Sequence, residues 1–218
     1  MLDFQLQVII LGACIGSFLN VVIYRLPKKI SFITRRSYCP SCNKKLSILD
    51  LFPVISWLFL LGRCRYCGNS INFRYPFVEL ITSFSFLLCL EGKGFLENDI
   101  AGFYVVIAGW ILCSYLIVLS IIDIDLMILP NSITYSGSFA GLLLICFYNI
   151  FYIKSFNLIL LDHFLALLLG FFGIYFLNLI VKLLLNKPGI GGGDAKLFAM
   201  SGAWLGLTGL EVTLTLSF

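Results

Sequence analysis

Two short polar segments interrupt an otherwise apolar chain: Ile122-Asp123-Ile124-Asp125-Leu126-Met127-Ile128-Leu129-Pro130-Asn131 and Gly189-Ile190-Gly191-Gly192-Gly193-Asp194-Ala195-Lys196. Each segment places a carboxylate at the end of a long apolar run. Ionisable groups beside membrane-spanning segments are costly and usually mark a functional site. Two carboxylates held close together share a proton, so that one can activate water while the other protonates the departing group. The pattern therefore predicts aspartic-protease chemistry, with one carboxylate from each segment.

Helix capping is the structural alternative for these aspartates. Asp194 stands before Ala195-Lys196-Leu197-Phe198 and could accept hydrogen bonds from the free N–H groups of a helix start, and Asp125 could do the same. Asp123 fits this alternative poorly, because a negative charge at the end of a long apolar helix opposes the helix dipole.

The composition predicts an all-α polytopic membrane protein. The chain has 218 residues, of which 60% are hydrophobic and 12% charged, and its mean hydropathy is +1.01. About six spans are expected, over residues 6–24, 76–90, 100–122, 132–153 and 157–185, and from residue 195 onward. The apolar stretch 49–61 is too short to span a bilayer, so we interpret it as core or interfacial packing.

The distribution of basic residues predicts the orientation in the membrane. Ten of the fifteen Lys and Arg residues lie between Arg25 and Arg74, which places this loop in the cytoplasm by the positive-inside rule. The N-terminus then faces outward, and both aspartate segments return to the cytoplasmic face. The acidic loop with Glu97 and Asp99 falls on the outer side. We attribute the net charge of +4 to this topology, and expect a lipid bilayer and no nucleic acid as partner.

The polar loop contains four regularly spaced cysteines. Cys39 and Cys42 form one C-x2-C pair, and Cys64 and Cys67 form a second pair twenty-one residues further on. This spacing is close to that of zinc ribbons, and four thiolates give the closed tetrahedral shell of a structural zinc. Disulfides are the alternative, but they seldom persist in the reducing cytoplasm. We therefore expect a structural Zn²⁺ that folds the loop.

Three motifs together resemble the type IV prepilin peptidases, which are GxGD-type intramembrane aspartyl proteases. The first motif is Gly191-Gly192-Gly193-Asp194, and the second is Asp123 followed seven residues later by Pro130-Asn131. The third is Gly16-Ser17-Phe18-Leu19-Asn20-Val21-Val22-Ile23-Tyr24-Arg25-Leu26-Pro27 near the N-terminus. The resemblance covers nearly the whole chain and is specific in this combination.

The resemblance implies an enzyme of the bacterial inner membrane. It implies cleavage of a short basic leader from type IV prepilins or pilin-like pseudopilins at the cytoplasmic membrane edge, with Asp123 favoured over Asp125 by its distance from the proline. Gly191, Gly192, Gly193, Asp125 and Pro130 would belong to the motif and substrate loops. Family members commonly also methylate the new N-terminus with S-adenosylmethionine. Gly62 matches a glycine associated with that step, although a turn before Cys64 explains it equally well.

The same resemblance implies three functional parts. These are a first transmembrane span in residues 1–26, a cytoplasmic zinc-binding loop associated with methyl transfer in 27–75, and a transmembrane peptidase domain in 76–218. Family members usually continue beyond a point equivalent to Phe218, so we expect either missing last spans or a short variant. The residues also leave open a membrane transporter, or a metal-dependent membrane transferase that uses Asp123-x-Asp125.

Overall fold

The computed structural model describes residues 2–31, 36–92, 100–153, 156–185 and 191–217. The predicted outer-loop residues Glu97 and Asp99, together with Gly189 and Ile190, lie outside this part of the chain. Helices occupy most of the described residues, in the order α1 (Leu2–Arg25), η1 (Ile48–Leu51), α2 (Ile55–Phe59), α3 (Arg74–Glu91), α4 (Ile100–Leu126), α5 (Asn131–Tyr148), the π-helical turn η2 (Asn149–Ile153), α6 (Phe156–Leu185) and α7 (Gly192–Ser217).

A long helix covers each of the six expected spans, so the all-α polytopic prediction is confirmed. Five of these helices (α1, α4, α5, α6 and α7) are long and apolar enough to cross a membrane. The sixth, α3, has 18 residues and carries Arg74, Glu79 and Glu91 along its length. It is therefore the most polar of the six.

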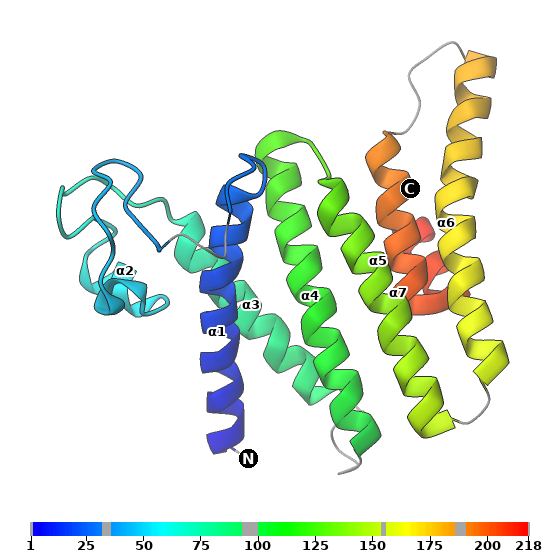
Figure 1. Cartoon of the computed structure of the whole chain (residues 1–218), viewed down its shortest axis with the longest axis horizontal. Helices are drawn as coiled ribbons and strands as arrows, with labels where there is room; N and C mark the ends of the chain where they lie inside the picture. The colour runs from blue at the N-terminus through cyan, green and yellow to red at the C-terminus, as the bar shows by residue number, and fades with distance from the viewer. Residues whose placement is uncertain (1, 32–35, 93–99, 154–155, 186–190, 218) are drawn as a thin grey trace. The chain divides into compact units, whose positions relative to one another are not determined.

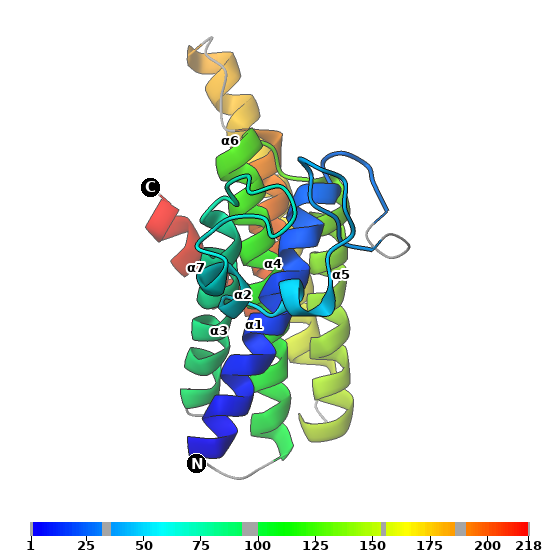
Figure 2. The ribbon, with the colours of Figure 1, turned by 90° about the vertical axis from the view of Figure 1, so that its left-hand side faces the viewer.

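The first compact unit, Met1–Ile122, is built on the pair α1 and α3 (Figures 1 and 2). Gly12 and Gly16 of α1 allow the close approach: a Cβ at Gly12 would lie 2.6 Å from Ser83 Cα, and one at Gly16 would lie 2.7 Å from Glu79 Cα. Trp110 of α4 stacks on Phe86 of α3 with the ring centroids 5.0 Å apart. The core of this unit includes Val8, Phe86, Leu90 and Val106.

The second compact unit, Asp123–Phe218, contains α5, α6 and α7. Within it the start of α5 and the start of α7 lie at the same end (Figure 1). Trp204 of α7 fixes the α5–α7 contact, because its ring lies against Gly141 and its Nε1 donates to the Gly137 carbonyl at 2.8 Å. Small residues also bring α6 and α7 together, since a Cβ at Gly202 would lie 2.5 Å from the Ala166 carbonyl oxygen.

Helix α7 is broken at Gly206, whose φ of +69° lies in the left-handed region that glycine adopts most readily. The break frees backbone groups inside an apolar environment, where each must find a partner. Asp162 of α6 accepts the Leu207 N–H at 3.2 Å, and His163 Nδ1 lies 3.0 Å from the Ala203 carbonyl oxygen. The neighbouring Asp162 and His163 thus have a structural role at the break.

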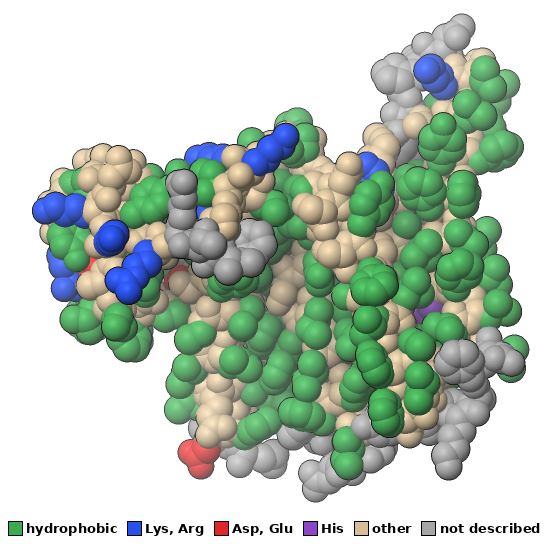
Figure 3. Space-filling model, in the orientation of Figure 1, with side chains coloured by type: hydrophobic (Ala, Val, Ile, Leu, Met, Phe, Trp, Pro, Cys, Tyr) green, Lys and Arg blue, Asp and Glu red, His purple; other side chains and the backbone are tan. Residues whose placement is uncertain are grey.

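The apolar stretch 49–61 forms η1 and α2 but does not form a core. None of the residues of η1 or α2 is buried, and Phe59 and Leu61 are 84% and 85% exposed. Figure 3 shows the segment between α1 and α3 with hydrophobic side chains along its lower edge and Lys and Arg side chains above them. The core interpretation of this stretch is therefore wrong, and interfacial packing stays a prediction.

Candidate functional site: a four-cysteine cluster and two aspartate segments

The two C-x2-C pairs lie in two matching turns. In the first, the Cys39 N–H donates to the Lys44 carbonyl at 2.9 Å, and the Asn43 N–H donates back to Cys39. In the second, the Cys64 N–H donates to the Asn69 carbonyl at 2.8 Å, and the Gly68 N–H donates back to Cys64. Isolated bridges Tyr38–Lys45 and Arg63–Ser70 close the two turns. The structure thus shows an internal repeat of this turn that the sequence did not make evident.

The turns require a left-handed residue directly after the second cysteine of each pair. Asn43 has φ +55° and Gly68 has φ +72°. Asparagine and glycine are the residues that reach this conformation at the lowest cost. The residue choice at these two positions therefore shapes each turn so that both of its thiols face the same point.

The four Sγ atoms of Cys39, Cys42, Cys64 and Cys67 lie within 4.8 Å of one another, and Cys39 Sγ is 4.0 Å from Cys67 Sγ. A tetrahedral zinc with bonds of about 2.3 Å needs sulfur atoms roughly 3.8 Å apart. The cluster could therefore hold a metal ion with small adjustments. All eight cysteines lie in the described part of the chain and are free thiols there, so the geometry favours metal binding over disulfides.

The electrostatics of the cluster also suit a cation. Burial opposes ionisation of Cys39, but backbone N–H groups of Cys42 and Ser41 and the adjacent thiols outweigh it and lower its pKa to about 7. The Asn69 N–H favours the Cys67 thiolate, yet burial and the three neighbouring thiols raise the Cys67 pKa to about 11. The thiols thus compete for negative charge, which a bound cation would relieve.

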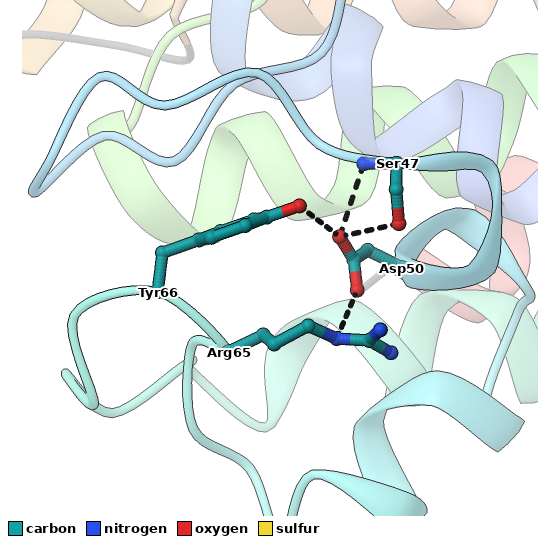
Figure 4. Close-up of polar contacts among 4 residues, drawn as sticks. All are labelled: Ser47, Asp50, Arg65 and Tyr66. Carbon is teal, nitrogen blue, oxygen red and sulfur yellow. Dashed lines mark hydrogen bonds and ion pairs between the residues drawn. The ribbon is translucent and has the colours of Figure 1, made fainter.

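Asp50 ties η1 to the second cysteine turn (Figure 4). Its Oδ2 accepts hydrogen bonds from the Ser47 N–H at 3.0 Å, the Ser47 hydroxyl at 2.8 Å and the Tyr66 hydroxyl at 3.3 Å. Its Oδ1 pairs with Arg65 Nε at 2.9 Å, and the Asp50 side chain is only 4% exposed. Burial alone would raise the Asp50 pKa, but the bonds from Ser47 and the charge of Arg65 lower it. Arg65 therefore pairs with Asp50 directly beside Cys64.

Gly62 lies against the indole ring of Trp57. Its φ is +67°, and a Cβ built there would lie 2.8 Å from Trp57 Cζ2. The ring cannot give way easily, because its Nε1 donates to the Ile71 carbonyl at 3.1 Å and Phe73 packs edge-on against it at 5.7 Å. A side chain at position 62 would therefore strain the backbone and displace Trp57.

Asp123 and Asp125 lie in the last turn of α4 and are exposed. The Asp123 carbonyl accepts the N–H of Met127 at 2.7 Å, and Met127 ends the helix with φ +53°. The Asp123 carboxylate therefore lies at the negative end of the helix dipole, as expected, where capping gives it no stabilisation. Pro130 caps the start of α5, and its carbonyl accepts the Ile133 N–H at 3.1 Å.

Asp194 lies inside the first turn of α7, which begins at Gly192, and it is half-buried. Its backbone N–H donates to the Gly191 carbonyl at 3.1 Å, so Asp194 is not the residue that caps the helix. Gly193 packs on the segment that follows Asp123, since its Cβ position lies 3.2 Å from Leu129 Cδ1. Gly192 has open space around it.

The two aspartate segments meet in a hydrogen bond that the sequence analysis did not anticipate. Lys196 Nζ donates to Asn131 Oδ1 at 2.6 Å, and it also lies 5.9 Å from the centroid of the Tyr135 ring. The structure thus brings the GxGD segment and the Pro130-Asn131 segment together. Among the described contacts of Asp123 and Asp194, no hydrogen bond joins the two carboxylates, so their shared proton stays a prediction.

Comparison with known proteins gives two family matches along the chain. Residues 10–91 match the bacterial peptidase A24 N-terminal domain, and residues 110–218 match the type IV leader peptidase family. The second match covers half of the chain and contains both aspartate segments. This chain belongs to the type IV leader peptidase family.

Relatives agree with this assignment. The prepilin leader peptidase/N-methyltransferase of Myxococcus xanthus is 36% identical over 202 residues, which are 93% of this chain and 56% of the relative. The type 4 prepilin-like proteins leader peptide-processing enzyme of Escherichia coli is 37% identical over 89% of this chain and 74% of its own length. A Neisseria gonorrhoeae prepilin leader peptidase/N-methyltransferase is 32% identical over 95% and 76%. The chain thus spans little more than half of the first of these relatives. No solved structure matches the chain.

Proposed function

We propose that this leader peptidase family member is an intramembrane aspartyl endopeptidase that removes the leader from type IV prepilins or pilin-like pseudopilins. Asp123 and Asp194 are its catalytic pair, and Gly191, Gly192, Gly193, Asp125 and Pro130 shape the loops that meet the substrate. The observation that carries the proposal is the junction of the two aspartate segments, where Gly193 packs on Leu129 and Lys196 bonds to Asn131. Family membership favours this function over a transporter or a metal-dependent transferase.

The proposed chemistry uses one carboxylate as base and the other as acid. The base takes a proton from water as its oxygen attacks the scissile carbonyl, and the acid gives a proton to the departing amide nitrogen. The exposure of Asp123 and the open space at Gly192 support access for an extended peptide. A shared proton predicts a bell-shaped dependence of rate on pH whose two apparent pKa values belong to the pair.

A second reaction is proposed for the N-terminal part of the chain. The cysteine cluster would hold a structural Zn²⁺, and the loop around it would serve N-methylation of the newly exposed amino group. In that step the amine nitrogen forms a bond to the methyl carbon of S-adenosylmethionine, the carbon–sulfur bond breaks, and the nitrogen releases a proton to solvent. The two relatives named N-methyltransferase support this assignment. The position of Gly62 against Trp57 also supports the assignment of N-methylation to this loop.

These roles divide the chain into residues 1–26 as first span, 27–75 as the cytoplasmic zinc-binding loop and 76–218 as the peptidase domain. The protein would lie in the inner membrane with its N-terminus outward and its active site at the cytoplasmic face. The cluster of basic residues between Arg25 and Arg74 supports this orientation.

The function is tested by incubating the purified protein with a prepilin and weighing the products. A single cut between leader and apolar helix is expected, and a methyl group on the new N-terminus is expected when S-adenosylmethionine is present. Cleavage should continue in mild EDTA, whereas the activity of a metal-dependent transferase would be lost. An intact prepilin after incubation with folded, zinc-loaded protein would contradict the proposal.

A further inference from the structure

Residues 48–61 form an apolar projection from the loop between α1 and α3. From Lys45 to Arg63, both exposed, the only charged residue in between is Asp50, whose side chain is 4% exposed. The exposed large side chains of the segment include Ile48, Phe52, Ile55, Leu58, Phe59 and Leu61. An apolar stretch of roughly 10–14 residues is typical of a buried core helix or of an interfacial or re-entrant membrane segment. The exposure of these side chains leaves the membrane alternatives.

The contacts of α2 place it beside the shaft of α1. The Val54 N–H, directly before α2, donates to Glu79 Oε2 of α3 at 2.7 Å. Glu79 packs against Gly16 of α1, where an added Cβ would lie 2.7 Å from Glu79 Cα. Gly16 precedes Arg25, the last residue of α1, by roughly 13 Å of helix. Figures 1 and 2 accordingly show α2 alongside α1 and not beyond its end. Since α1 is long and apolar enough to cross a membrane, α2 lies at the depth of the bilayer.

One face of α2 points away from the protein at this depth. On a helix, positions 55, 58 and 59 share a face and position 57 lies opposite. Trp57 faces inward, because its Nε1 donates to the Ile71 carbonyl at 3.1 Å. Ile55, Leu58 and Phe59 therefore face outward, and they are 53%, 58% and 84% exposed.

The backbone of the segment suits a lipid environment, in which polar groups must be paired within the protein. Glu79 accepts the Val54 N–H, as described above. Carbonyls of the preceding turn accept, at 2.9–3.1 Å, the N–H groups of Ser56, Leu58, Leu60, Leu61 and Gly62. The segment can therefore enter hydrocarbon without exposing these donors.

The segment enters and leaves on one side. Val54 and Leu61 flank α2 with φ values of +58° and +50°, a conformation that residues other than glycine adopt rarely and under constraint. Asp50 near the entrance pairs with Arg65, just beyond the exit, at 2.9 Å. The two ends are thus joined, and the basic residues that border the segment can reach lipid phosphates.

We propose that residues 48–61 form a re-entrant segment that dips into the bilayer from the side of the cysteine cluster, with Ile55, Leu58 and Phe59 in contact with acyl chains. The partner is lipid rather than a protein helix, because these three side chains project outward and none of them lines the cavity between the loop and the ends of α1 and α3. The segment anchors the cysteine cluster at the membrane surface, since Cys64 follows it closely in the chain. This membrane contact goes beyond the proposed peptidase and methyl-transfer reactions and depends on neither.

The test is carbene labelling of the full-length, zinc-loaded protein in phosphatidylcholine vesicles, with a photoactivated diazirine on the lipid acyl chain. Mass spectrometry of the peptides shows which side chains carry the label. Three aromatic residues give a matched comparison: Phe59, Phe18 of α1, which is 49% exposed, and Tyr66 of the second cysteine turn, which is 40% exposed. We expect Phe59 to be labelled as strongly as Phe18 and several-fold more strongly than Tyr66, because the reagent is confined to hydrocarbon. Labelling of Phe59 only at the level of Tyr66 would overturn the proposal.

Two variants test whether the apolar face itself holds the segment in lipid. Phe59→Asp should lower the labelling of Ile55 and Leu58 several-fold, because a charge at this depth is costly. Phe59→Leu is the matched control and should leave their labelling unchanged, with zinc content as the check on folding in both variants. Unchanged labelling in Phe59→Asp would contradict the placement of position 59 in hydrocarbon.

Protein partners for the same face are distinguished in the same experiment. Loss of the Phe59 label on addition of a prepilin, with the Phe18 label unchanged, would assign the face to that substrate. Loss of the Phe59 label as the protein-to-lipid ratio rises would assign it to a second copy of the chain. Either result would overturn lipid as the partner.

Discussion

Lys196 Nζ donates a 2.6 Å hydrogen bond to Asn131 Oδ1, and this bond joins the start of α7 to the start of α5. Lys196 follows Asp194 by two residues, and Asn131 follows Pro130 directly. The bond links the two helix starts and therefore constrains how both aspartate segments are presented. Lys196 is therefore a positioning residue in the proposed peptidase site.

Replacing Lys196 by Met should slow prepilin cleavage about fivefold, the effect of losing about 1 kcal/mol from an exposed, charge-assisted hydrogen bond. Lys196→Gln, which keeps a donor, should recover part of the rate. The measurement is the cleavage rate at saturating and at low prepilin concentration. Lys182→Met, at an exposed position in the last turn of α6, is the control. Equal rates for wild type and Lys196→Met would contradict the positioning role.

Asp123→Asn and Asp194→Asn should each reduce cleavage by about a thousandfold or more, because each variant removes the acid or the base. Asp125→Asn should retain most activity, since Asp125 is assigned to the loop rather than the catalytic pair. Mass spectrometry of the prepilin products measures all three, with zinc content as the check on folding. If Asp125→Asn were inactive and Asp123→Asn active, the assignment within this turn of α4 would be reversed.

Metal analysis should give close to one zinc per chain, and Cys64→Ser should reduce this value strongly because it opens the tetrahedral shell. Cys14→Ser changes an exposed cysteine on α1 and should leave the zinc content unchanged. Strong chelation should loosen residues 36–73, which hydrogen exchange would detect. Protein purified without chelators that contains no metal would refute the zinc assignment.

Asp50→Asn should destabilise the cysteine loop near neutral pH, because it removes the charge that Arg65 and Ser47 stabilise. The native pKa of Asp50 is lowered relative to an unfolded value of about 3.9. Its contribution is therefore fully present above that value and is lost as the pH falls through the native pKa. Hydrogen exchange of the loop should separate wild type and variant at pH 7. The gap should narrow as the pH falls below about 4 and close once the pH is below the native pKa of Asp50. Asp3→Asn, at an exposed position on α1, should show no such gap.

Gly62→Ser should impair methyl transfer while sparing cleavage, because its side chain would collide with Trp57. Gly68→Ser is the matched control: Gly68 has a similar φ of +72°, but nothing lies within 4 Å of its Cβ position. Both variants carry the left-handed backbone cost of about 1–2 kcal/mol. Because Gly68 lies in the second cysteine turn, the zinc content of both variants is measured beside methyl transfer, and the comparison is made at equal zinc content. Methyl transfer is measured with labelled S-adenosylmethionine. An equal loss of methyl transfer in both variants would mean that Gly62 serves only the backbone turn before Cys64.

The sequence by itself determined the six long helices and the cysteine cluster. Runs of some twenty apolar residues can satisfy their backbone in a bilayer only as helices, so the expected spans and the observed helices agree closely. The two C-x2-C pairs carry their own turn residues, Asn43 and Gly68, and this local geometry gathers two thiols in each turn. These features depend on short-range chemistry, which a sequence displays directly.

The tertiary structure decided how distant segments meet. The contact of Gly193 with Leu129, the bond of Lys196 to Asn131, and the bond of Asn20 to the Tyr75 carbonyl all link residues far apart in the chain. The exposure of Phe59 and Leu61 also followed only from the structure, since an apolar run of that length fits a core or a surface equally well. Such contacts depend on which helix faces pack together. Hydrophobic pattern alone does not fix that choice when nearly every face is apolar.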